Sequence, residues 1–224
     1  MTSGGNAEAS ETATHLNYQS NEDALIKPLD PLLPDPAKPV SPVDPTDPNG
    51  PATGIGGSLS LDFASSFQFG QQAISTKDKT YYAQAQEYVT AAGLKTSGPN
   101  YVQVTDIRGT GSGWRLAVKQ TAQFQSATGK VLKGAELSFQ QGEMVSNLSA
   151  DLAPTAVSSF TLPLNSEVDV ITAQAEKGMG TWLYRFGNDE ATGVKGISLR
   201  VPGKTVKYAQ RYQTALTWTL KDVP

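Results

Sequence analysis

Two tryptophan-x-leucine triplets are the residues of this chain best suited to chemistry at a surface: Trp114-Arg115-Leu116 and, much later, Trp218-Thr219-Leu220. In an extended strand the side chains alternate between two faces, so each Trp points the same way as the Leu that follows it. The Trp ring has a flat apolar face and a polar N–H, which suits stacking on a sugar ring. The same face could equally form the core of a β protein, because burying an aromatic of this size is a main source of stability. The sequence leaves both roles open, with core packing the simpler interpretation.

Other aromatic residues extend the set of candidates for ligand contact. Trp182 and Tyr101 lie in strand-like runs. A second candidate surface combines tyrosines with nearby lysines: Tyr81, Tyr82, Tyr88 and Tyr101 with Lys77 and Lys79. Tyrosines at strand edges are also common structural residues, so this cluster alone identifies no ligand. The residues that we expect to contact a ligand or a partner protein are Trp114, Leu116, Trp218, Leu220, Trp182 and Tyr101.

Residues for catalysis are sparse. The only histidine, His15, lies in the polar N-terminal tail, which removes the usual general base from the rest of the chain. Four carboxylates could in principle face one another across a cleft, as in a glycosidase, but no spacing selects a pair among Asp62, Asp106, Asp151 and Asp169. The chain has no Cys, which excludes disulfides, thiolate nucleophiles and Cys-based zinc sites. We therefore expect no enzyme, no cofactor and no metal.

The charge is unevenly distributed along the chain. The formal net charge is −3, but acidic residues concentrate in residues 1–53 and basic residues predominate after Glu190. A basic end would attract anionic polymers such as teichoic acids, although salt would screen so small an excess. Nucleic-acid binding would require a larger and more clustered excess, so we do not expect it. No stretch is long and apolar enough to span a membrane.

The N-terminal quarter differs in composition from the rest. Residues 1–27 are polar and aperiodic, and we expect a disordered acidic tail there. Residues 28–53 contain nine of the fourteen prolines, which fall at every third position from Pro36 to Pro51. Three residues per turn is the period of polyproline II, so this spacing predicts a stiff, extended stalk.

Residues 54–224 read as one all-β domain. Short runs of alternating apolar residues are separated by Gly, Asn and Asp turn signals, and the runs centre on Leu61, Val104, Leu116, Phe139, Val170, Tyr184 and Leu199. Several short antiparallel strands at this spacing predict a β-sandwich. Residues 81–88 fit a helix or an irregular loop, and the sequence does not decide between them.

The surroundings of the two triplets resemble the WxL domain family of Gram-positive surface proteins. The first triplet follows Val104-Thr105-Asp106-Ile107-Arg108-Gly109-Thr110-Gly111-Ser112-Gly113, and the second follows Val201-Pro202-Gly203-Lys204-Thr205-Val206. Further similarity lies at residues 57–63, 67–70 and 180–182, so the resemblance covers about residues 54–224. It implies a secreted protein held noncovalently at the cell wall by peptidoglycan binding.

The resemblance also implies alternatives and a location. Similar proteins are encoded with a partner that recognises the WxL domain, so the domain could instead be an assembly module of a surface complex. A third reading is an adhesin for host extracellular matrix. The start of the chain lacks the basic and apolar regions of a signal peptide, so the resemblance implies that a signal was removed and Met1 was supplied for expression. Residues 162–166 lack the pattern of a sortase signal, so we expect noncovalent attachment.

Overall fold

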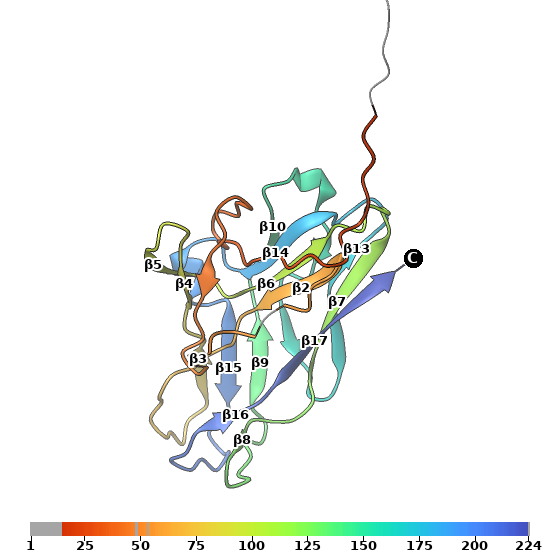
Figure 1. The fold of residues 1–224 in the computed structure, drawn as a ribbon. Coiled ribbons are helices and arrows are strands. Elements are labelled where there is room, and N and C mark those ends of the chain that lie inside the picture. The colour runs from red at the N-terminus through yellow and green to blue at the C-terminus, as the bar shows by residue number, and fades with distance from the viewer. Residues whose placement is uncertain (1–14, 48, 53, 224) are drawn as a thin grey trace, which may run out of the picture.

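The computed structural model of the protein describes residues 15–47, 49–52 and 54–223. The regular secondary structure of the described residues is almost entirely β-strand, with one short α-helix and one 3₁₀ turn (Figure 1). The elements, in chain order, are β1 (Ser41–Pro42), β2 (Leu59–Ala64), β3 (Lys79–Tyr82), β4 (Gln86–Val89), β5 (Lys95–Gly98), β6 (Tyr101–Asp106), β7 (Gly113–Gln120), β8 (Gln125–Ser126), β9 (Glu136–Phe139), β10 (Gly142–Val145), η1 (Ala150–Leu152), β11 (Thr155–Ala156), β12 (Phe160–Leu162), β13 (Glu167–Ala173), β14 (Gly180–Phe186), α1 (Glu190–Gly193), β15 (Ile197–Val201), β16 (Tyr212–Gln213) and β17 (Leu216–Val223).

The alternating apolar runs all lie in strands, which confirms the all-β prediction. In residues 81–88, which the sequence left between helix and loop, the structure has the end of β3, a three-residue connection and the start of β4. Asp189 caps the four-residue helix α1 through a capping box with Thr192, and the Thr192 N–H donates to Asp189 Oδ1 at 2.7 Å. No helix among the described residues has the length and apolar character needed to cross a membrane.

The strands form several small antiparallel sheets. Three sheets have four strands each, in the orders β10-β14-β6-β2, β11-β13-β7-β17 and β12-β9-β15-β3, while β1-β4-β5 and β16-β8 are smaller. One apolar core receives side chains from all three four-stranded sheets, including Val102, Leu116 and Phe139. The pairing does not confirm the expected two-sheet sandwich, because an alternating pattern reports which face of a strand is buried and not which strands become neighbours.

The sheet that contains β6 is covered on both faces. All six residues of β6 are buried, as expected of a strand between two layers. Val102 and Val104 point into the main core, whereas Tyr101 joins Leu29, Phe63 and Leu183 in a second, smaller core. The N-terminal segment contributes Leu29 to this second core.

The prediction of a proline-rich stalk is wrong for the part of residues 28–53 that is described. Leu29 and Val40 are buried, and Ser41 and Pro42 pair with Val89 and Tyr88 of β4. The Leu29 N–H donates to Gln103 Oε1 at 2.8 Å, and Arg185 Nη1 donates to the Pro31 carbonyl at 2.9 Å. Figure 1 shows this segment, in red to orange, lying against the domain. The physical reason is that apolar anchors between the prolines bury area, while backbone groups pair with the domain.

The predicted tail is also shorter than expected. Residues 1–14 lie outside the described residues, and residues 15–20 are exposed. From Glu22 onward the chain contacts the domain: Ser58 Oγ donates to Glu22 Oε2 at 2.7 Å, and the Gly57 N–H donates to the carbonyl of buried Ala24 at 2.9 Å. The folded unit therefore begins more than thirty residues before the expected boundary at residue 54.

Candidate functional site

The first triplet is part of the core. Trp114 and Leu116 have no exposed surface on β7, which lies between β13 and β17. The Trp114 indole N–H donates to the Gly178 carbonyl at 3.1 Å. Gly178 has φ +72°, and a Cβ at this position would lie 2.8 Å from Trp114 Nε1. Only glycine can therefore pack this close to the indole ring without a clash. In this fold, Trp114 and Leu116 pack and do not contact a ligand.

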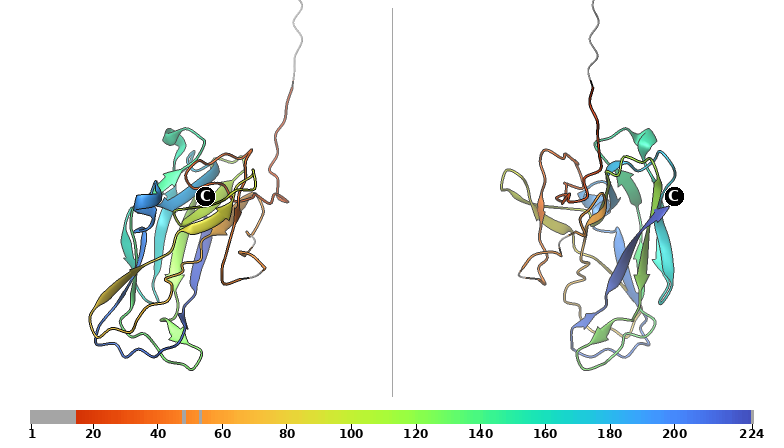
Figure 2. Two further views of the ribbon diagram at one scale, coloured as in Figure 1. Left: turned by 90° about the vertical axis from the view of Figure 1, so that its left-hand side faces the viewer. Right: turned by 45° about the vertical axis from the view of Figure 1, so that its right-hand side comes forward.

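The second triplet lies beside the first but is only half-buried. Strand β17 pairs with β7 so that Leu220 is opposite Leu116 and Trp218 is opposite Val118. Directly paired residues share a face, so Trp218 and Leu220 pack against the core from its margin. Strand β17 is the last strand of its sheet, as Figures 1 and 2 show. The triplets are therefore side by side, but only the second has accessible surface.

The other two predicted contact residues are internal. Trp182, opposite Val104, is 2% exposed, and its indole N–H donates to the Met179 carbonyl at 2.9 Å. Tyr101 has no exposed surface, and its hydroxyl is the buried side-chain group that has no hydrogen-bond partner among the described residues. Burial raises the pKa of Tyr101 well above its ordinary value. The expectation that Trp182 and Tyr101 contact a ligand is therefore corrected to packing.

The motif before the first triplet joins the two triplet strands. Arg108 donates from Nε and Nη2 to the two carboxylate oxygens of buried Asp106, at 3.0 and 2.9 Å. It also donates to the carbonyls of Ser112 and Gly113 and to the carboxylate of Asp222 on β17. The hydrogen bond with Asp106 raises the pKa of Arg108, which keeps the guanidinium charged. The sequence identified this motif by resemblance but not its role as a clamp on the C-terminal strand.

Three cations of the basic C-terminal end, Arg200, Lys207 and Lys221, have internal partners. Lys207 Nζ donates to the carbonyls of Pro202, Gly203 and Thr205, at 3.0, 3.3 and 2.8 Å. Arg200 pairs with Asp78 and Glu136, and Lys221 pairs with Glu167. Because these cations have partners, the basic end presents less free positive charge to an anionic polymer than the sequence predicted.

A polar groove lies where the N-terminal segment meets β4 and β5. Its volume is about 290 Å³, at the lower limit of small-ligand sites. Sequence reasoning missed this groove because its two sides come from the segment that was expected to be a stalk and from the domain. The residues that line it are Val43, Pro45, Ser66, Gln68, Gln84, Ala85, Gln86, Glu87 and Ser97.

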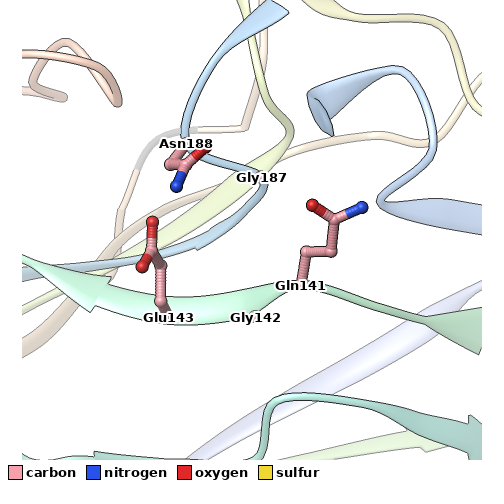
Figure 3. A pocket seen from close by; sticks show the side chains of 5 residues that line it. All are labelled: Gln141, Gly142, Glu143, Gly187 and Asn188. Atoms are coloured by element: carbon pink, nitrogen blue, oxygen red, sulfur yellow. The ribbon is translucent and has the colours of Figure 1, made fainter. Parts of the chain in front are cut away.

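A smaller hollow of about 150 Å³ lies at the start of β10, between Gln141, Gly142, Glu143, Gly187 and Asn188 (Figure 3). Glu143 Oε1 accepts from Arg185 Nη2 at 2.8 Å, so its carboxylate is already paired. Figure 3 shows the side chains of Glu143 and Asn188 directed toward one another. No group of three or more His, Asp or Glu side chains that could hold a metal occurs in the described part of the chain.

The fold and these surfaces define an all-β binding domain with an accessible aromatic residue on an edge strand and a polar groove. The chain belongs to the WxL domain family, whose members are surface cell wall-binding domains: the family model matches residues 5–224. The match starts far before residue 54, so the proline-rich segment belongs to the family domain, in agreement with its packing. Searches of curated proteins and of solved structures gave no match. The protein is therefore a cell wall-binding protein of the cell surface.

Proposed function

We propose that this domain attaches noncovalently to peptidoglycan through the accessible side of its second triplet. The observation that carries the proposal is the difference in exposure among the three tryptophans: Trp114 and Trp182 are internal, whereas Trp218 is half-buried on an edge strand. A wall ligand can reach only the last of these rings.

The packing of Trp218 favours binding of a rigid polymer. One side of the ring rests on the core, and Leu216 and Leu220 flank it on the same face of β17. A side chain that is already held loses little conformational entropy on binding. An indole placed in this way offers an apolar surface to the C–H face of a sugar ring and a polar N–H to a hydroxyl.

Co-sedimentation tests the proposal with the full chain and peptidoglycan that has been stripped of protein and teichoic acid. The wild type should sediment, and Trp218→Ala should lose most of this binding. Thr217→Ala is the matched control, because Thr217 is exposed on the opposite face of the same strand. Thermal melts establish that both variants are folded at the assay temperature. Sedimentation of Trp218→Ala at the wild-type level would contradict the proposal.

A second candidate function is assembly with a partner protein, and the free edge of β17 favours it. Strand β17 pairs with β7 in continuous register over eight residues, and no strand of the described residues lies on its other side. An edge this long and regular can accept a strand from another chain. In that case the protein would sediment with walls that keep their proteins and would fail to sediment with stripped peptidoglycan.

A further inference from the structure

We propose that the polar groove beneath residues 43–45 is a binding site for neutral sugars that carry acetamido groups. This inference rests on the proposed attachment to peptidoglycan and deepens it, because it assigns a ligand class to a surface distant in sequence from the tryptophan triplets. The groove is defined by its nine lining residues, which come from the N-terminal segment and from three parts of the domain.

The groove is held open by hydrogen bonds on both sides. The Val43 N–H donates to the Glu87 carbonyl at 2.8 Å, and Gln86 Nε2 donates to the Val43 carbonyl at 2.9 Å. On the other side, Ser66 Oγ donates to Asp44 Oδ2 at 2.9 Å. The docked N-terminal segment thus forms one wall of a preformed site, and the site is incomplete without it.

The lining offers polar side chains that carry no charge. The side-chain amides of Gln68 and Gln84 and the hydroxyl of Ser97 have no hydrogen-bond partner among the described residues. Gln84 is exposed and Gln68 is half-buried. Each amide can donate and accept at once, which matches both a sugar hydroxyl and an acetamido group. Val43, Pro45 and Ala85 add an apolar surface that can pack on a sugar ring or on an acetamido methyl group.

The charges at the groove indicate which wall polymer fits. Its nine lining residues include no Lys or Arg, and one of them is Glu87. Asp44 lies at the rim, where hydrogen bonds from Thr46 and Ser66 outweigh the effect of partial burial and keep the pKa of Asp44 below its ordinary value. Two carboxylates repel a polyphosphate chain, so the groove favours neutral glycan over teichoic acid.

The test is a titration of the isotope-labelled full chain with an oligomer of N-acetylglucosamine, followed by NMR. Signals of the Gln68 and Gln84 side-chain amides should shift, and Gln68→Ala and Gln84→Ala should each weaken binding about tenfold, the loss expected for one or two neutral hydrogen bonds. Gln141→Ala, which changes the smaller hollow, is the control and should bind like the wild type. A glucose oligomer, which lacks the acetamido group, and poly(glycerol phosphate) should bind much more weakly.

The outcomes separate this inference from the proposed function. If neither amide shifts, if the glucose oligomer binds equally well, or if both glutamine variants bind like the wild type, the groove is not the site. Dependence of wall sedimentation on Trp218 would then still support the proposed attachment. Conversely, oligomer binding that needs Gln84 but not Trp218, with no effect of Trp218→Ala on sedimentation, would support the groove and contradict the triplet as the wall contact.

Discussion

Strands β7 and β17 carry the same Trp-x-Leu triplet in neighbouring positions of one sheet, yet the two triplets have different environments. On β7, which has a strand on each side, Trp114 and Leu116 are completely buried. On β17, which pairs with one strand in the described part of the chain, Trp218 and Leu220 remain partly exposed. The difference follows from position in the sheet and not from the residues themselves. The same triplet therefore serves stability at the centre and remains accessible for binding at the edge.

Trp114→Ala should give the largest loss of stability. Removing a fully buried aromatic side chain costs about 3–5 kcal/mol, which for a chain of this size lowers Tm by roughly 6–20 °C. Trp218→Ala removes a half-buried ring and should cost about 1 kcal/mol. Calorimetry of both variants measures the contrast, and equal losses would show that the two triplets have equivalent environments.

Arg108→Ala should have the next largest effect, because Arg108 links the approach to β7 with β17. The substitution leaves the buried Asp106 carboxylate without its partner, at a cost of roughly 3 kcal/mol. Asp222→Ala removes only an exposed partner and should cost less than about 1 kcal/mol. Urea unfolding of the two variants distinguishes them, and a smaller loss for Arg108→Ala than for Asp222→Ala would refute the clamp.

Asp62→Asn tests burial of a charge beneath the N-terminal segment. Desolvation raises the pKa of Asp62, although hydrogen bonds from Ser60, Thr105 and Gln103 partly offset it. The pKa of Asp62 is therefore higher in the folded state than in the unfolded state. Its contribution to the free energy of unfolding is complete below the ordinary pKa of 3.8 and is lost as the pH rises through the folded-state pKa. We expect Asp62→Asn to raise Tm by a few degrees at neutral pH, with the difference from the wild type shrinking on acidification.

Asp78→Asn should change the stability of the fold in the opposite direction. The hydrogen bond from the Gly203 N–H, and to a smaller extent that from Arg200, lowers the pKa of this exposed carboxyl. Its contribution to the stability of the fold is therefore present above pH 3.8 and is lost as the pH falls through the lowered pKa. The variant should therefore be slightly less stable than the wild type at neutral pH. If the Tm differences of the two variants have the same sign at neutral pH, one of the two environments is wrongly assigned.

Tyr101→Phe should have the smallest effect. The Tyr101 ring packs against Phe63, with centroids 4.8 Å apart, while its hydroxyl has no partner among the described residues. Phenylalanine keeps the packing and removes an unsatisfied polar group, so Tm should stay the same or rise slightly. A clear loss of Tm, measured by the same calorimetry, would show that the hydroxyl has a partner in solution.

Local features of the fold could be predicted from the sequence. Alternation identified strands such as β2, β7 and β14, and the glycine-rich run before Trp114 separates β6 from β7, as its residue types indicated. That Trp114, Leu116 and Val118 share one face of their strand also followed from the two-residue period. These features depend on residues close in sequence, which is why local reasoning succeeds for them.

Features that depend on distant contacts could not be predicted. The proline spacing of residues 36–51 is compatible with a free polyproline helix, but the Leu29 N–H donates to Gln103 and Ser41 pairs with Val89, and both partners are more than forty residues away. The centre and edge positions of the two triplets depend on the order of strands in the sheet. The polar groove depends on both, because it forms only where the docked segment meets β4 and β5.

The most direct test of the central contrast is solvent access to the three tryptophan indole N–H groups, which NMR resolves in the nitrogen-15-labelled full chain. Trp114 and Trp182 donate to the Gly178 and Met179 carbonyls, whereas the Trp218 N–H has no partner among the described residues. A soluble gadolinium chelate should attenuate the Trp218 signal strongly and leave the other two nearly unchanged, and the Trp218 N–H should exchange fastest with solvent. Equal attenuation of the Trp114 and Trp218 signals would contradict the division between a core triplet and an accessible one.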